Sequence, residues 1–319
     1  MPKTNKLNFG FCLFLFVCIV FVSISPYFLF PQINKRYVLN RVFAKDDVFL
    51  ELWNVDTFEG GTNSRSRFLE KCAVSFEKEN RKQYIIVQNL TREELLSLLS
   101  QDKVPDILSF GVGLGELVRS YCCELNIEAE FRNNIQKSGE YNKKQLSVPW
   151  CVGGYVFCGD VTPDCVVGVG VENNLPPTIS QNKKKYSTQY EAYKGFLNKE
   201  FDVLLGTQRD FYRLSNKLEL GVIDSCDFSY VETYSDLLQH FSVCSKDDDK
   251  FRISCEFINY VLSLKIQEKL TGIGMFSVLN KAIYSNTNCE EFEQAIFNVS
   301  DFGKVFDDDA KREDLMQKY

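Results

Sequence analysis

The stretch from Phe49 to Asn80 places a strand, a glycine turn and a helix in immediate succession. Phe49 to Val55 is an apolar, aromatic-rich run of strand length. After Gly60-Gly61 the apolar residues recur at helical spacing, at Phe68, Leu69, Cys72, Ala73 and Phe76. The side-chain period therefore changes from about 2 to about 3.6 across the two glycines. In an open α/β sheet such a change lies at the carboxyl end of a strand, where ligands bind in a crevice.

The next hundred residues repeat this alternation of strand and helix. Tyr84 to Gln88 is a short β-branched strand, and Thr91-x-x-Glu94 is a capping box that opens a helix through Leu99. Ile107 to Phe110 is another buried strand. Strands that alternate with helices at this spacing predict a parallel sheet.

The glycine run from Gly111 to Gly115 has two interpretations. Glycines that follow a strand can hold a pyrophosphate, but the spacing here is G-x-G-x-G after the third strand. The dinucleotide fingerprint requires G-x-G-x-x-G in the first strand–helix unit. The run therefore favours a tight turn that allows backbone or ligand to approach closely.

The second half of the chain contains a change of character and a second strand-to-helix turn. Pro149 and Gly153-Gly154 interrupt an otherwise strand-like run from Leu146 to Phe157, as expected of a segment that crosses between lobes. Further elements are expected as a helix around Tyr190–Leu197, a strand at Phe201–Leu205, a turn at Gly206–Asp210, a returning strand at Tyr234–Val243, and helices at Phe251–Leu270 and Glu290–Phe297.

Several of these segments resemble bacterial extracellular solute-binding proteins, the receptors of ATP-binding-cassette importers, in the branch that includes sugar binders. The resembling residues are Glu51, Trp53, Val55-Asp56, Phe58-Glu59-Gly60-Gly61, Ser64-Arg65, Phe68-Leu69, Pro105 to Gly111, Pro149 to Tyr155, and Leu204 to Asp210. The resemblance spans most of the chain in the same order.

This resemblance implies a two-lobed, periplasmic-binding-protein-like (type II) α/β fold. The first lobe is expected to comprise residues 47–148 and 240–319, and the second lobe residues 149–239. Between Gly154 and Phe201 the chain is shorter than in the resembled receptors. A shortened second lobe is consistent with a shallow cleft, a small ligand, or a receptor that has lost transport.

The N-terminus carries a targeting signal. Lys3 and Lys6 precede an apolar run from Phe9 to Phe30, and a bilayer needs roughly 20 such residues. Ser23-Ile24-Ser25 is the single candidate cleavage site, and Pro26 disfavours it. We expect a signal/anchor segment at residues 1–31 and a polar stalk at residues 32–46, with a cleaved and secreted form as the alternative. The extracellular location follows from the resemblance.

Charge and cysteine usage exclude some classes of partner. The formal charge of −6 and the pI near 5.2 argue against nucleic-acid binding, which requires clustered basic residues. The chain has twelve cysteines but no CxxC pair, and His240 is its single histidine, so neither a zinc site nor another cofactor is expected. Export prompts a disulfide interpretation for some of these cysteines, although Cys72 and Cys255 lie on apolar helical faces.

The first turn contains four candidate ligand-binding residues besides the strand-end Trp53. Asp56 and Glu59 are predicted to accept hydrogen bonds from ligand hydroxyls, with turn capping or pairing to Arg65 as the alternative. Gly61 allows close approach of the backbone. Trp53 offers a flat face for stacking, with core packing as its alternative.

Other candidates lie at the third strand end, the first crossing and the second turn. Ser109 and Gly111 supply hydroxyl and amide groups, and Trp150 and Tyr155 supply aromatic surface, with hinge packing as the alternative for Tyr155. Gln208 and Arg209 bring a multidentate set of donors to the opposite wall, and the alternative for Arg209 is an interlobe salt-bridge network with Asp210.

The residue pattern does not predict an enzyme. Asp56 and Glu59 lie on one short turn and cannot flank a glycosidic bond from opposite faces. His240 lies in an apolar strand and is predicted to be a core residue. We therefore expect a monomeric receptor for a small polar, saccharide-like solute that works with a membrane permease. The alternatives are a membrane-anchored sensory or structural ectodomain of the same fold and, with less support, an enzyme on this scaffold.

Overall fold

The computed structural model describes Cys18 and residues 47–132, 135–170 and 182–307. The chain divides into two units, Met1–Asp47 and Val48–Tyr319, and the fold below is that of the second unit. The predicted anchor and stalk lie outside the described residues, apart from Cys18. Among the residues that the structure does describe, no helix is both long enough and apolar enough to cross a bilayer.

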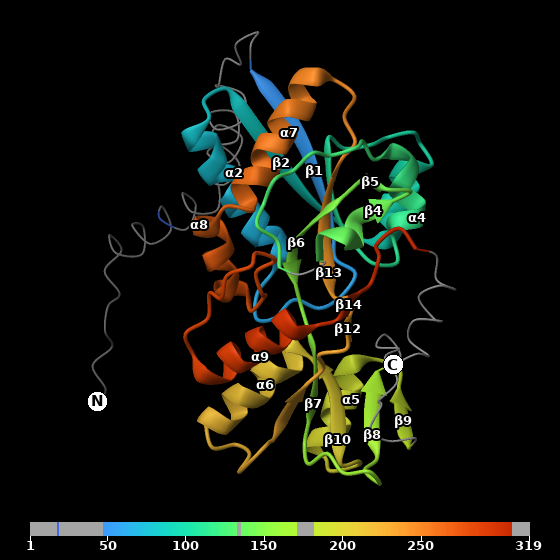
Figure 1. Cartoon of the computed structure of the whole chain (residues 1–319), viewed down its shortest axis with the longest axis vertical. Helices are drawn as coiled ribbons and strands as arrows, with labels where there is room; N and C mark the ends of the chain where they lie inside the picture. The colour runs from blue at the N-terminus through green and yellow to red at the C-terminus, as the bar shows by residue number, and fades with distance from the viewer. Residues whose placement is uncertain (1–17, 19–46, 133–134, 171–181, 308–319) are drawn as a thin grey trace, which may run out of the picture. The chain divides into compact units, whose positions relative to one another are not determined.

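The first sheet has the strand order β2-β1-β3-β13-β6 (Figure 1). β1 runs parallel to β2 and β3, whereas β13 is antiparallel to both β3 and β6. The strands are β1 (Val48–Val55), β2 (Gln83–Leu90), β3 (Ile107–Gly111), β6 (Val148–Val152) and β13 (Leu238–Val243). The parallel sheet predicted from the first three strands is confirmed.

Helices cover both faces of the first sheet, so its central strands β3 and β13 are buried on both sides. Leu52 of β1 joins the core of α2 (Arg65–Glu79) and α7 (Asp248–Val261), while the next residue, Trp53, joins a second core. That second core contains Leu95 of α3 (Arg92–Leu99) and Val118 of α4 (Gly115–Val118). We call this sheet and these helices the first lobe.

The second sheet has the order β11-β7-β10-β8-β9 and forms the second lobe with two helices. β10 is parallel to β8 and antiparallel to β7, and β8 is parallel to β9. The elements are β7 (Tyr155–Cys158), β8 (Val167–Gly170), β9 (Lys183–Tyr186), α5 (Gln189–Leu197), β10 (Val203–Thr207), α6 (Gln208–Glu219) and β11 (Phe228–Tyr230). The two-lobed α/β fold class is therefore confirmed.

Three segments connect the lobes. Gly153-Gly154 joins β6 directly to β7, and β12 (Tyr234–Ser235) lies between β11 and β13. β14 (Asp301–Phe302) pairs in parallel with β12 (Figure 1). A Cβ on Gly153 would lie 2.4 Å from Gln208 Oε1, and one on Gly154 would lie 2.3 Å from Ile296 Cδ1, so neighbouring side chains would have to move to admit either.

The structure differs from expectation for two helices. One is divided into three shorter elements, and the other packs on the second lobe. The helix expected over Phe251–Leu270 is instead α7, the short α8 (Leu264–Gln267) and a 3₁₀ helix, η4 (Glu268–Ile273). The buried Gln267 side chain donates to the Val261 carbonyl at this break. The last helix, α9 (Thr287–Asn298), packs Phe292 against Phe211 and Tyr230, so it contacts the second lobe.

The remaining described elements are short. Two 3₁₀ helices, η2 (Arg119–Tyr121) and η3 (Ile135–Gly139), and a two-stranded hairpin, β4 (Glu140–Tyr141) with β5 (Lys144–Gln145), complete the first lobe. The glycine run after β3 is the tight turn that was expected. Gly113 has a φ of 94°, and a Cβ on Gly115 would lie 1.7 Å from the Val305 carbonyl oxygen.

Candidate functional site

The turn between β1 and α2 is fixed at its far end by contacts to the backbone at the end of η4 and at Gly274, which follows it. The Thr62 N–H donates to the Ile273 carbonyl at 2.9 Å, and Asn63 Nδ2 donates to the Gly272 carbonyl at 2.9 Å. A Cβ on Gly61 would lie 1.9 Å from the Gly274 carbonyl oxygen. Gly61 is therefore required because two backbones meet here.

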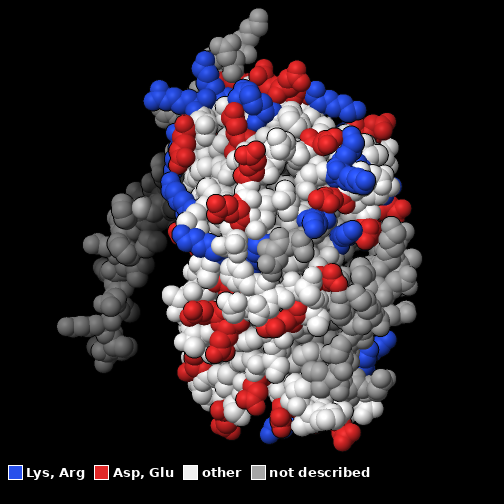
Figure 2. All heavy atoms as spheres, in the orientation of Figure 1, with Lys and Arg blue, Asp and Glu red and all other residues white. Residues whose placement is uncertain are grey.

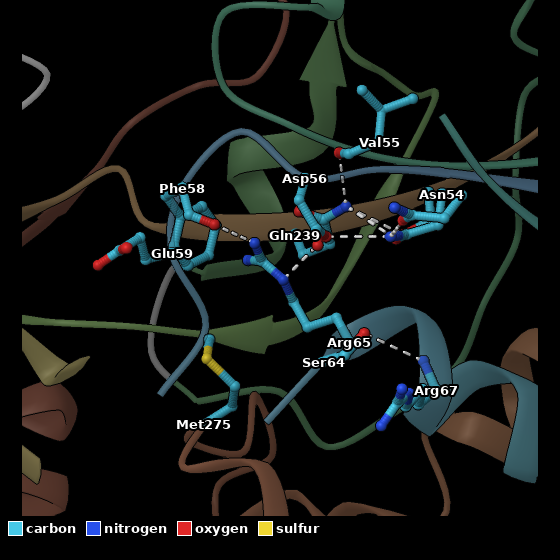
Figure 3. Close-up of polar contacts among 12 residues, drawn as sticks. Asn54, Val55, Asp56, Phe58, Glu59, Ser64, Arg65, Arg67, Gln239 and Met275 are labelled. Atoms are coloured by element: carbon cyan, nitrogen blue, oxygen red, sulfur yellow. Dashed lines mark hydrogen bonds and ion pairs between the residues drawn. The ribbon is translucent and has the colours of Figure 1, made fainter. Parts of the chain in front are cut away.

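Asp56 is held in place by an ion pair and a hydrogen bond on one oxygen (Figure 3). Arg65 Nε lies 3.0 Å from Asp56 Oδ1, and Asn54 Nδ2 donates to the same oxygen at 3.0 Å. The Asp56 side chain is 36% exposed, whereas that of Arg65 is 1% exposed. No described residue donates a hydrogen bond to Asp56 Oδ2, so one carboxylate oxygen is available at the carboxyl end of β1.

Arg65 supports the turn from below. Its guanidinium donates to the Phe58 carbonyl and lies 4.0 Å from the centre of the Phe58 ring (Figure 3). Phe58 in turn packs against two apolar cores, the one that contains Leu52 and the one within the second lobe. The buried cation therefore binds Asp56 and the carbonyl of a residue that contacts the second lobe, rather than pointing at solvent.

A buried polar network lies beneath Asp56. Ser109 Oγ donates to Asn54 Oδ1 at 2.8 Å and accepts from Trp150 Nε1 at 3.1 Å. Gln239 Nε2 lies 3.0 Å from the Val55 carbonyl and 3.1 Å from Ser109 Oγ (Figure 3). This network satisfies polar groups inside the sheet and fixes Asn54, which orients Asp56. Sequence reasoning missed Asn54 and Gln239, whose signal was an amide side chain within an apolar strand.

The opposite wall is the start of α6 in the second lobe. Thr207 and Asp210 form a capping box, which places Gln208 and Arg209 in the first turn of the helix. Gln208 Nε2 donates to the Glu59 carbonyl at 2.9 Å, and Arg209 Nη1 donates to the Gly61 carbonyl at 3.3 Å. The predicted residues of the two turns are thus brought into direct contact.

Charges at this junction are balanced. Glu59 Oε2 lies 3.7 Å from Arg209 Nε and 3.6 Å from Arg213 Nη1, and Arg213 also pairs with Asp210 at 3.1 Å. Burial raises the pKa of Asp210, against the opposing hydrogen bond from Gln189. The expected salt-bridge network between the lobes is present, and Arg213 is a member that sequence reasoning missed.

Three predicted aromatic contacts are corrected by the structure. Trp150 is 0% exposed because Phe68 and Phe241 stack on it, with ring centres at 5.7 and 5.4 Å. Trp53 is 3% exposed within the core, and Tyr155 is 1% exposed and donates to Asp236 Oδ1 at 2.7 Å. None of these rings presents an open face for stacking in this structure.

Ser109 and Gly111 also lie below the surface. Ser109 is 0% exposed, and its hydroxyl is engaged by the network described above. A Cβ on Gly111 would lie 1.9 Å from Thr57 Oγ1, so the first turn crosses directly over the end of β3. The first turn therefore covers the carboxyl ends of both β1 and β3.

His240 is a core residue, as its apolar strand predicted. It is 0% exposed, and its ring nitrogens lie 3.3 Å from Ser138 Oγ and 3.1 Å from Ser147 Oγ. Burial lowers the pKa of His240 to about 3. Its imidazole is therefore neutral at physiological pH and is enclosed by protein.

A separate surface cavity of about 770 Å³ lies beside α2. It is lined by Arg67, Lys71 and Lys78 of α2 and by Lys269 of η4, among other residues, and it does not include Asp56. Figure 2 shows basic and acidic side chains interspersed on the face in view. The cavity also includes Asn63 and Ser64 at the end of the first turn, but not Glu59, Gln208 or Arg209, which form the junction of the two turns.

Comparisons with known proteins support the fold through structure. No protein-family model matches the chain, and no curated protein matches it either. Among solved structures, the GacH receptor of Streptomyces glaucescens, described unliganded and with acarbose, has a TM-score of 0.61 at 11% identity, over 85% of this chain and 92% of that chain.

Two further solved structures are similar to this chain in fold. The maltodextrin-binding protein MalE1 of L. casei has a TM-score of 0.60 at 10% identity, covering 85% of this chain and 92% of that chain. The MalE domain of Bdellovibrio bacteriovorus, bound to maltotriose, has a TM-score of 0.56 at 12% identity, covering 85% and 93%. The chain has the fold of these sugar-binding solute-binding proteins, as the sequence resemblance predicted.

Proposed function

We propose that this chain is an extracellular receptor that binds a small, neutral, saccharide-like solute between its lobes and delivers it to an ATP-binding-cassette permease. The observation that carries the proposal is the Asp56 carboxylate, fixed through Oδ1 and half-exposed at the carboxyl end of β1. A preorganised carboxylate oxygen is a strong acceptor for sugar hydroxyls. Its position matches the crevice where α/β sheets bind ligands.

The charge balance of the junction favours a neutral ligand over an anion. Arg65 is engaged by Asp56, Arg209 by Glu59, and Arg213 by both Glu59 and Asp210. Each of these three arginines thus faces a carboxylate of the protein. An anion would have to compete with these carboxylates, whereas a polyhydroxylated ligand needs acceptors such as Asp56.

Entry of a ligand requires the two turns to separate. Gln208 and Arg209 contact the first turn directly, and the lobes are joined by the Gly153-Gly154 crossing and by β12 with β14. Hinge opening about these crossings, followed by closure on the ligand, is the motion that the arrangement suits. We propose in addition that the second lobe is shortened, and that the first lobe ends at residue 148 and the second lobe at residue 239.

The test is calorimetric titration with the neutral oligosaccharides raffinose and maltotriose, after a thermal-shift screen of further saccharides. Asp56→Asn keeps an acceptor for Arg65 but removes the charge, so it should weaken binding by about 1.5–3 kcal/mol, or roughly 10- to 100-fold. The matched control is Asp224→Asn, which makes the same change at an exposed loop position. Binding should change little with ionic strength.

Two results would contradict the proposal. Strong salt dependence with unchanged or tighter binding by Asp56→Asn would indicate an anionic solute held by Arg65 and Arg209. An absence of binding across the saccharide screen would favour the sensory or structural ectodomain. That alternative is tested by measuring association with a membrane partner other than a permease.

We further propose that residues 1–31 anchor the protein and that it acts as a monomer at the outer face of the membrane. The long apolar run and the poor cleavage site support an uncleaved segment. Intact mass of the membrane-extracted protein tests this, and a mature N-terminus between Ser25 and Asp47 would reject the anchor.

A further inference from the structure

Four cysteines form two pairs, and each pair lies within one lobe. Cys122 and Cys244 lie beside the first sheet, whereas Cys158 and Cys226 lie at the edge of the second. Every cysteine that the structure describes is a free thiol. These two pairs stand apart from the others because a backbone hydrogen bond joins the residues beside each pair, and in each pair one thiol shifts the pKa of the other.

The first pair is formed where two main chains run side by side. The Cys123 N–H donates to the Val243 carbonyl at 2.8 Å, so the neighbours of Cys122 and Cys244 are joined directly. The Cys244 side chain is 8% exposed and Cys122 is half-buried, and both belong to the core that contains Trp53. A disulfide requires main chains this close, since its Cα atoms are about 4.4–6.8 Å apart.

The second pair lies where two antiparallel strands meet, with the cysteines offset by two residues along the strands rather than directly opposite. Cys158 of β7 is opposite Phe228 of β11, and the Gly159 N–H donates to the Asp227 carbonyl at 2.9 Å. The residues that follow Cys158 and Cys226 are therefore joined by a backbone hydrogen bond. Cys158 is 0% exposed, and Cys226 is half-buried at the sheet edge.

Each pair combines a more accessible thiol with a buried one. Hydrogen bonding from Cys244 lowers the pKa of the Cys122 thiol, and hydrogen bonding from Cys158 lowers that of Cys226. The pKa values of the two buried partners are raised, by the hydrogen bond for Cys244 and by burial for Cys158. The accessible member is thus the better nucleophile toward an external disulfide, and the buried member is placed to resolve the product.

We propose that Cys122–Cys244 and Cys158–Cys226 are sites of disulfide formation in an oxidising compartment. A disulfide oxidant such as oxidised glutathione supplies the chemistry. The Cys122 thiolate attacks it, breaking the oxidant's S–S bond, forming a mixed disulfide and releasing one glutathione. The Cys244 sulfur then displaces the second glutathione, so two thiols lose two protons and two electrons while the oxidant becomes two thiols. Cys226 and Cys158 react in the same way.

Neither bridge crosses the hinge. One joins two segments of the first lobe and closes a loop that contains the whole second lobe, and the other ties β7 to the segment before β11 within the second lobe. Bridges in these places stabilise each lobe mainly by constraining the unfolded chain. They leave the Gly153-Gly154 crossing unrestrained, so the proposal is independent of the ligand proposed above.

The test is peptide mapping without reduction after incubation of the folded, full-length protein with oxidised glutathione and alkylation of the remaining thiols. Cys226 and Cys244 lie on one tryptic peptide, so an aspartate-directed protease is added to cut before Asp227 and Asp236. We expect bridged peptides for both pairs and a higher melting temperature than that of the reduced protein. Cys123→Ser should keep the first bridge, and Cys122→Ser should remove it.

Two outcomes would overturn the proposal. In one, Cys244 and Cys158 are recovered alkylated after full oxidation. In the other, Cys122 is bridged to Cys123, or Cys226 to a cysteine other than Cys158. Both are read on the wild-type protein, so they do not depend on whether a serine variant folds. Cys289, whose Sγ donates to Tyr212 Oη at 4.0 Å, is the internal control that should remain alkylatable.

Discussion

Replacing Gly61 by alanine should destabilise the protein through a clash between two backbones. The added methyl group would lie 1.9 Å from the Gly274 carbonyl oxygen and 2.4 Å from its carbonyl carbon. Neither atom belongs to a flexible side chain, so the turn has to move away from residues 272–274. That movement strains the hydrogen bond from the Thr62 N–H to the Ile273 carbonyl.

The expected loss combines overpacking with the weakened hydrogen bond. Overpacking costs about 1–3 kcal/mol and a hydrogen bond about 1 kcal/mol, so we expect about 2–4 kcal/mol in all. At roughly 2 °C per kcal/mol for a chain of this size, the melting temperature should fall by about 4–8 °C. The fluorescence of the two buried tryptophans, Trp53 and Trp150, reports unfolding.

The chain provides a matched control in the same segment. A Cβ on Gly272 has no described atom within 4 Å, and its φ is not in the left-handed region. Gly272→Ala should therefore change the free energy of unfolding by no more than about 0.5 kcal/mol, or raise it slightly. Equal melting temperatures for Gly61→Ala and Gly272→Ala would refute the backbone-contact reasoning.

Two further predictions concern buried titratable side chains. Because the pKa of His240 is about 3 in the folded protein and near 6.5 when unfolded, the unfolded state binds the extra proton, and stability should fall by about 2 kcal/mol from pH 7 to pH 5 at this site. Urea titrations should show a smaller fall for His240→Gln, and an equal fall would contradict the assignment. Arg132 and Glu293, at 0% and 1% exposure and 3.8 Å apart, form a buried pair. Glu293→Gln alone should cost about 3–5 kcal/mol, and adding Arg132→Met should recover part of it, whereas additive losses in the double-mutant cycle would count against the pairing.

The elements that were predicted well from the sequence depend on residues that lie close together along the chain. The change of period across Gly60-Gly61, the Thr91–Glu94 capping box and the glycine turn after β3 each depend on neighbours within a few residues. Such local preferences are visible in one sequence because they do not depend on the rest of the fold. The structure confirms all three.

The parts that sequence did not predict depend on residues far apart in the chain. Nothing near Trp150 indicates that Phe68 and Phe241 cover its two faces. Hydrophobic periodicity identifies the face of a strand that is buried, but it does not identify what packs there. The same limit explains why Gln208 was expected to face a ligand, although its amide contacts the first turn instead.

The side chain of Gln208 links three parts of the molecule, accepting from the Gly154 N–H at 3.2 Å and donating to the Glu59 carbonyl at 2.9 Å. Under the hinge motion proposed above, these bonds stabilise the closed arrangement, in which the two turns touch, whether or not a solute is present. A bond worth about 1 kcal/mol shifts the ratio of closed to open molecules by about fivefold. An apparent dissociation constant includes the fraction of molecules competent to bind. Substitutions at Gln208 should therefore retune the affinity for any solute, even though no solute need touch this residue.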